Sequence, residues 1–267
     1  MDGNGRWAEQ RGLIRSEGHR AGAEVVKHIV QACIEKKIPV LSVWAFGRDN
    51  WARPPAEVDF LMQLLLSVLN VELEEMHQMG VRLVFTGGRE ELSEALQHAI
   101  GSAEAYTARN SRLTLNVMFN YGGKWDILQG VKKIAEDVAK GSLQVKDINE
   151  KIFSSYLNTR HLPDPDLFIR TSGEQRISDF FLWQLSYTEL YFSELCWPDF
   201  TVTEFAKALD FFSERERRYG KTSKQLGDKS LHAMPRLPED CDADQSSLSP
   251  KDIKRGQSVQ LDESYYV

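Results

Sequence analysis

Cysteine is scarce in this chain of 267 residues, which carries only Cys33, Cys196 and Cys241. The three are scattered and form no CxxC pair, so neither a structural zinc site nor a disulfide framework is indicated. Such sparse cysteine usage is typical of a reducing compartment, and we expect the protein to be cytoplasmic.

Long apolar runs and an excess of positive charge are missing as well. No run approaches the roughly 20 apolar residues of a membrane-spanning helix, and the polar N-terminus does not read as a signal peptide. The net charge of -6 argues against nucleic-acid binding. Arginines are nevertheless bunched in residues 6–20, 48–53 and 170–176. Focused basic clusters in an acidic chain indicate a pocket for a small anion.

Several common catalytic motifs are absent too. There is no GxxxxGK[ST] of a P-loop NTPase, and no GxGxxG opens a helix after a strand. The GxSxG elbow of many hydrolases and the aspartate-rich DDxxD of trans-type prenyl synthases are also missing. No nucleophile or water-activating pair stands out, which argues against a generic phosphohydrolase.

Apolar, β-branched runs alternate with helical patterns along most of the chain. Strands are expected at residues 40–46, 81–85, 113–121, 167–171 and 189–193, and helices at about 21–36, 56–78, 89–110, 124–140, 145–157, 180–185 and 201–219. The alternation predicts one α/β domain over residues 1–221, with a mainly parallel central sheet flanked by helices. Residues 222–267 are rich in Asp, Ser, Lys and Pro, and a polar, disordered tail is expected there.

The stretch Met1-Asp2-Gly3-Asn4-Gly5-Arg6-Trp7 follows no ordinary secondary-structure pattern. Its glycines let backbone N–H groups turn toward a common point. Arg6 offers a planar fork of donors suited to phosphate, and Asp2 is a carboxylate suited to Mg²⁺. Together they predict a diphosphate cradle with a metal anchor, against the alternative of a mobile, glycine-rich terminus.

Two further arginine-bearing segments, Gly47–Arg53 and Arg170–Ser178, each follow the carboxyl end of an expected strand. Ligands of open parallel sheets bind in the crevice outside those ends. We therefore expect the two segments to converge with the N-terminal stretch. The combined cationic donors exceed what one phosphate needs and would suit two diphosphates.

These motifs, with Gly18–Gly22, Asn120–Gly123, Trp197–Phe200 and Arg217–Gly220, resemble in order those of the cis-prenyltransferase (undecaprenyl diphosphate synthase, isoprenyl transferase) family. The resemblance covers residues 1 to about 221. It implies cis-prenyl chain elongation, in which isopentenyl diphosphate is condensed onto an allylic diphosphate such as farnesyl diphosphate. A long-chain polyprenyl diphosphate is expected, undecaprenyl diphosphate for a cell-wall lipid carrier.

The resemblance also assigns roles to residues. Asp2 is the expected catalytic carboxylate, holding Mg²⁺ together with Glu189, and Asn50 occupies the position of proton removal, where an amide would orient or relay. The expected substrate-binding residues are Gly3, Asn4, Gly5, Arg6, Trp7, Arg15, His19, Gly47, Arg48, Asp49, Trp51, Arg53, Arg170, Arg176, Ile177, Ser178 and Arg218. Within that set, Arg170, Arg176 and Ser178 match the isopentenyl diphosphate site.

The resemblance further implies a homodimer, in which Arg218 reaches the partner's active site, and peripheral membrane contact for product release. Helix 56–78 has a wider apolar surface than one core-facing stripe requires. It is either well buried or lines the product tunnel, and the family resemblance favours the tunnel, with Ala45 and Leu113 at its wall.

In the family, a first strand precedes the Asp-Gly-Asn-Gly-Arg loop, whereas here Met1 stands where that strand would end. We expect the first family strand to be missing and this N-terminally truncated form to be poorly active or unstable. The alternative function is therefore a non-catalytic or impaired subunit of a prenyltransferase dimer.

Overall fold

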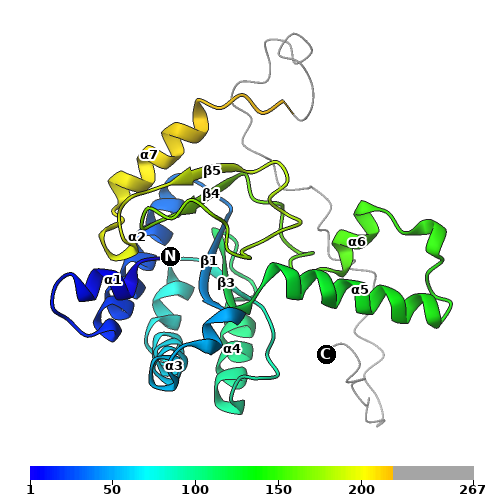
Figure 1. The fold of residues 1–267 in the computed structure, drawn as a ribbon, viewed down its shortest axis with the longest axis horizontal. Helices are drawn as coiled ribbons and strands as arrows, with labels where there is room; N and C mark the ends of the chain where they lie inside the picture. Colours follow the sequence, from blue (N-terminus) through cyan, green and yellow to red (C-terminus); the bar gives the residue numbers. More distant parts are fainter. Residues whose placement is uncertain (219–267) are drawn as a thin grey trace, which may run out of the picture. The chain divides into compact units, whose positions relative to one another are not determined.

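The computed structural model describes residues 1–218, which are coloured in Figure 1. The helices are α1 (Asn4–Glu9), α2 (Arg15–Glu35), α3 (Pro55–Gln78), α4 (Glu94–Thr107), α5 (Gly123–Ala139), α6 (Glu150–Tyr156) and α7 (Val202–Ser213). The strands are β1 (Val40–Gly47), β2 (Val81–Thr86), β3 (Leu113–Tyr121), β4 (Leu167–Arg170) and β5 (Glu189–Phe192). Three 3-10 turns are η1 (Arg48–Ala52), η2 (Val145–Asp147) and η3 (Trp197–Asp199). The expected tail at 222–267 lies outside the described residues, as do residues 219–221.

The strands of this part of the chain form two parallel sheets. One has the order β1-β3-β2, and the other pairs β4 with β5. In the larger sheet Val117 of β3 lies between Val43 and Phe85. The predicted α/β architecture with parallel strands and flanking helices is confirmed, with the strands divided between two sheets.

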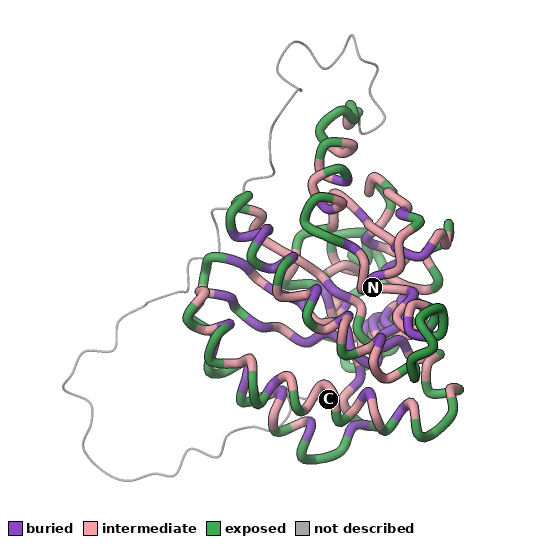
Figure 2. The backbone as a smooth tube through the Cα atoms, turned by 90° about the vertical axis from the view of Figure 1, so that its left-hand side faces the viewer, coloured by how far each residue is buried: buried purple, intermediate pink, exposed green. Residues whose placement is uncertain are grey.

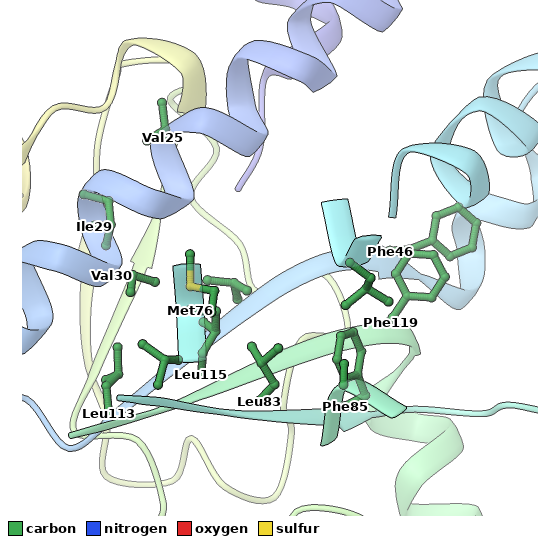
Figure 3. Close-up of a cluster of buried hydrophobic side chains, with 14 of the residues drawn as sticks. Val25, Ile29, Val30, Phe46, Met76, Leu83, Phe85, Leu113, Leu115 and Phe119 are labelled. Carbon is green, nitrogen blue, oxygen red and sulfur yellow. The ribbon is translucent and has the colours of Figure 1, made fainter. Parts of the chain in front are cut away.

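The main core lies between the three-stranded sheet and helices α2 and α3 (Figure 3). Leu113 and Leu115 of β3 face Ile29 and Val30 of α2, and Met76 of α3 is buried among them. Each fully buried side chain of this kind contributes about 1.5–3 kcal/mol relative to exposure. Figure 2 shows the same pattern along the backbone, with buried positions on the strands and exposed positions along the outer helix faces.

Some local expectations are wrong. Residues 4–9, which look like a glycine-rich loop, form α1. Residues 180–185 do not form a helix, because Asp179 and Phe181 have positive φ angles of 67° and 41° that a right-handed helix does not allow. The last helix is capped by Thr201, whose Oγ1 accepts from Glu204 N at 3.3 Å. Among residues 1–218, no helix is long and apolar enough to cross a membrane.

Candidate functional site

The predicted convergence of the N-terminal stretch with the segment after β4 is observed. Arg170 Nη2 donates to Asp2 Oδ2 at 2.9 Å, and Arg170 Nη1 donates to Ser178 Oγ at 2.8 Å and to the carbonyl of Arg176. The Arg170 side chain is 12% exposed, against 38% for Asp2. Arg170 therefore organises the loop, while Asp2 keeps an open face toward solvent.

The backbone of Asp2 is fixed more firmly than its side chain. Thr171, buried at the end of β4, accepts from Asp2 N at 2.9 Å and donates to Asp2 O at 2.8 Å. Trp197 N donates to the same carbonyl at 2.9 Å. Gly3 follows with φ 96°, and a Cβ there would lie 2.8 Å from Ser172 Cβ and 2.9 Å from Cys196 Sγ. Only glycine meets both demands, so this turn requires glycine at position 3.

Arg6 lies beside this pair. It donates to Ser172 Oγ at 2.6 Å, and its Nη2 is 3.6 Å from Asp2 Oδ1. Its Nη1 is 3.1 Å from Glu174 Oε1, and Glu174 also binds Arg176. Arg6 and Arg176 are 45% and 61% exposed, so both guanidinium groups remain accessible to an anion.

A second set of cationic side chains surrounds one carboxylate that was not predicted from the sequence. Glu57, in the first turn of α3, lies 3.1 Å from Arg15 Nε, 3.3 Å from His19 Nε2 and 3.2 Å from Arg53 Nη1. Its side chain is only 12% exposed. The Arg53–Glu57 spacing of i, i+4 at a helix start was the available sequence signal. Arg15 also closes over Gly5, where a Cβ would overlap its guanidinium, so this group adjoins the N-terminal stretch.

Asp2, Glu57 and His19 have lowered pKa values. Burial opposes ionisation of Asp2, but the hydrogen bond and charge of Arg170 outweigh it and hold the pKa below the usual range. The same balance, with Arg15 as the main cation, lowers the pKa of Glu57. Burial lowers the pKa of His19 despite the nearby Glu57. Both carboxylates are therefore ionised and His19 is mainly neutral at pH 7.

The segment after β1 forms the turn η1. Asn50 Oδ1 accepts from Gly47 N at 2.9 Å, which closes the turn and directs the candidate proton-transfer residue. Trp51 Nε1 donates to Asn120 Oδ1 at 2.8 Å, and Arg48 pairs with Glu91. Nη1 of Arg48 is buried without a hydrogen-bond partner, so its N–H donors are unused among the described residues. Asp49 is exposed.

Several remaining predicted residues have other surroundings. Trp7 donates to Asp199 Oδ1 at 2.7 Å and lies beneath the guanidinium of Arg11 at 4.3 Å. Asn4 Oδ1 is buried and has no hydrogen-bond partner. Ile177 is half-buried beside Ser178, and Arg218 Nε donates to Glu216 Oε2 at 2.9 Å.

The two expected metal carboxylates lie at opposite ends of the β4–β5 pair. Asp2 is bound to Thr171, just past the end of β4, whereas Glu189 pairs in register with Leu167 at its start. Four strand residues span about 13 Å. Glu189 Oε2 is instead 3.2 Å from Arg215 Nε, and residues 1–218 contain no cluster of three acidic, His or Cys ligands. A lone, half-open carboxylate fits Mg²⁺ only where phosphate oxygens complete its shell.

An α/β fold with two adjoining arginine groups and one open carboxylate defines a protein suited to polyanionic, phosphate-bearing ligands. The chain belongs to the cis-prenyltransferase family, since the family model described as "Putative undecaprenyl diphosphate synthase" matches residues 1–220.

Individual relatives agree with this family. The chain is 56% identical over 223 residues to the ditrans,polycis-undecaprenyl-diphosphate synthase ((2E,6E)-farnesyl-diphosphate specific) of Legionella pneumophila (strain Paris), covering 84% of this chain and 94% of that protein. It is 48% identical over 233 residues to the enzyme of the same name from Xanthomonas axonopodis pv. citri, covering 87% and 91%.

Solved structures agree as well. Lavandulyl diphosphate synthase from Lavandula x intermedia, in complex with dimethylallyl diphosphate, matches with a TM-score of 0.81 and 37% identity, over 83% of this chain and 95% of that one. A probable undecaprenyl diphosphate synthase from Campylobacter jejuni matches with a TM-score of 0.68 and 33% identity, over 76% and 93%.

Proposed function

We propose that the protein condenses isopentenyl diphosphate onto farnesyl diphosphate and repeats the step with cis geometry to make undecaprenyl diphosphate. The observation that carries the proposal is the Asp2–Arg170 pair flanked by Arg6 and Arg176, because it combines an ionised carboxylate with accessible phosphate donors. The high identity to farnesyl-specific synthases supports the same substrate class.

Two different sets of residues would bind the two diphosphates. Arg6, Arg15 and His19 would bind the allylic diphosphate and stabilise the charge that develops as it leaves. Arg170, Arg176 and Ser178 would hold isopentenyl diphosphate, so that its alkene faces the allylic carbon. Asn50 would orient the carbon-bound proton that is lost.

Mg²⁺ would be held by Asp2 together with diphosphate oxygens, and it would neutralise charge on the leaving group. Because its pKa is lowered, Asp2 is already ionised at neutral pH and could bind Mg²⁺ without first losing a proton. Glu189 would join Asp2 in binding Mg²⁺ only after a rearrangement that brought the two carboxylates together.

The growing chain would occupy the apolar layer between α3 and the three-stranded sheet. Val58, Leu61, Leu69 and Met76 of α3 are buried there, and Leu113 is 1% exposed. Ala45 is exposed on the edge strand β1 and lies outside this layer. Because the layer is packed, elongation would require α3 to move away from the sheet. A small, partly open hollow is lined by Phe85, Leu92, Ile100 and Phe119.

We further propose a homodimer that works in the cytoplasm and touches the membrane only to release product. Arg218 is exposed at the end of the described chain, where it would be accessible to a second copy. Size-exclusion chromatography with light scattering would give twice the mass of one chain if this is right.

The test of the activity is incubation with farnesyl diphosphate, radiolabelled isopentenyl diphosphate and Mg²⁺, followed by separation of products by length. Undecaprenyl diphosphate as the main product supports the proposal. Mainly short products would contradict the chain length, and no condensation would favour a non-catalytic or impaired subunit. Phosphate release without chain growth would indicate a phosphohydrolase.

A further inference from the structure

One buried amide joins the segments that follow three neighbouring strands. Asn120, at the end of β3, is 0% exposed. Its Oδ1 accepts from Trp51 Nε1 in η1 at 2.8 Å. Its Nδ2 donates to Gly88 O at 3.0 Å and to Glu91 Oε2 at 2.8 Å, both in the segment after β2.

The backbone at this position is as constrained as the side chain. Asn120 has φ 53°, in the left-handed region that asparagine tolerates better than most side chains. Its carbonyl accepts from Gly88 N at 3.2 Å. The residue thus contacts Gly88 through both backbone and side chain, which locks the β2 and β3 segments together.

The chain of contacts continues to a second residue of η1. Glu91 Oε2 accepts the hydrogen bond from Asn120 Nδ2, and Glu91 Oε1 pairs with Arg48. Both Trp51 and Arg48 lie in the turn that carries Asn50, and both are tied to Asn120, Trp51 directly and Arg48 through Glu91. No other described residue contacts Trp51 Nε1 and Glu91 together.

We propose that Asn120 is a positioning residue for catalysis, which sets the orientation of Trp51 directly and of Arg48 through Glu91. The inference rests on the proposed function, because η1 is a substrate segment only in a prenyltransferase. A misplacement of about 1 Å can cost roughly 100-fold in rate. Loss of the Asn120 contacts should therefore lower kcat rather than merely weaken the fold.

The test uses Asn120→Asp, which keeps shape but turns the donor into a carboxylate. That carboxylate would face the Gly88 carbonyl and the Glu91 carboxylate, so Glu91 and Arg48 are released. Adding Glu91→Gln restores a donor to the new carboxylate and leaves an oxygen for Arg48. We expect kcat to fall at least tenfold in Asn120→Asp and to recover at least threefold in the double variant.

Asn116 supplies the matched control. It is also 0% exposed on β3, and its amide binds Thr86 Oγ1 at 2.7 Å and Ser42 Oγ at 3.1 Å, away from η1. Asn116→Ala and Asn120→Ala are compared at a temperature where thermal melts show both folded. The expected result is a wild-type kcat, within twofold, for Asn116→Ala only.

A readout that does not depend on turnover separates the two proposals. The Trp51 indole N–H resonance, assigned with Trp51→Phe, should shift in Asn120→Ala and stay in place in Asn116→Ala. An unmoved resonance, or equal kcat losses in both alanine variants, would overturn the positioning role. If the wild-type protein fails to condense the two diphosphates, the proposed function is wrong. The Trp51 resonance would still test the Asn120–Trp51 contact in that case.

Discussion

Asp2 and Arg170 are 168 positions apart in the chain, yet Asp2 Oδ2 and Arg170 Nη2 lie 2.9 Å apart. The pair joins the N-terminal stretch to the end of β4 and holds the carboxylate ionised. It also leaves Asp2 38% exposed, so the group that would bind Mg²⁺ is positioned before substrate arrives.

Replacing Asp2 with Ala should lower kcat by roughly 10²–10³-fold, the cost of removing one preorganised charge-stabilising group. The fold should persist, because Thr171 and Trp197 hold the Asp2 backbone rather than its carboxylate. Steady-state assays with far-UV circular dichroism measure both effects. Asp210→Asn, an exposed change on α7, is the control and should leave kcat unchanged.

Arg176→Ala should raise the KM for isopentenyl diphosphate about 10–100-fold, since a charge-assisted hydrogen bond contributes about 1.5–3 kcal/mol. The side chain is 61% exposed and pairs only with Glu174 in the described residues, so stability should change by less than about 0.5 kcal/mol. Lys207→Ala, a 60% exposed residue paired with Glu204, is the matched control. An unchanged KM in Arg176→Ala would remove this residue from the site.

Gly18→Ala should destabilise the protein by about 1–3 kcal/mol, the usual cost of overpacking. A Cβ at this position of α2 would collide with the backbone carbonyl of Asn4 and push the N-terminal stretch off the helix. Gly101→Ala, in α4, meets nothing within 4 Å and should stabilise by up to about 1 kcal/mol. Urea unfolding measures both, and equal effects would show that the Asn4–Gly18 contact is not tight in solution.

Stability should decline as pH falls from 7.5 to 5.5. Burial lowers the pKa of both His19 and His161 below the usual 6.5 of histidine, so the unfolded state binds more protons between the folded-state and unfolded-state pKa values. The stabilising contribution is complete above pH 6.5 and is lost as pH falls toward the folded-state pKa values. Urea unfolding across this range should show the slope, and His161→Asn should flatten it. If His161→Asn leaves the slope unchanged, groups other than His161 cause the pH dependence of stability.

Mg²⁺ alone should bind weakly, because within residues 1–218 no cluster of three ligands surrounds Asp2. With inorganic diphosphate present, calorimetry should show tighter Mg²⁺ binding in the wild type and a loss of that gain in Asp2→Ala. Tight binding of the ion without diphosphate would point to a preformed metal site that the described residues do not contain.

The strands were predictable because their residues are suited to strands and little else. Val81–Thr86 and Leu113–Tyr121 are rich in apolar and β-branched residues, and most of their positions are buried, as in a parallel strand covered on both faces. Residues 180–185 are equally apolar but pack as irregular chain, because positive φ angles at Ser178 and Asp179 turn the backbone away from a helix. Periodicity cannot report such turns.

Site residues could be predicted where they stand in an unusual local sequence, and could not be predicted where the local sequence is ordinary. Asp2, Arg6 and Arg170 stand out by their context, and the structure brings them together. Glu57 looks like an ordinary first-turn acid of α3, and Asn120 looks like a strand-end residue. Their roles depend on partners that lie 38 and 69 positions away, His19 and Trp51, which local sequence does not specify.

The contacts of the N-terminal stretch also set an order of events during synthesis. Asp2 needs Thr171 and Trp197, and Trp7 needs Asp199, so residues 2–7 leave the ribosome long before any of these partners exist. The β1-β3-β2 sheet can assemble once residue 121 has emerged. Closing the long loop back to residue 2 comes afterwards, at an entropic cost that grows with loop length. The contacts around Asp2 can therefore form only after residue 199 has been made, and a nascent chain stopped before that residue would lack the partners that hold the N-terminal stretch.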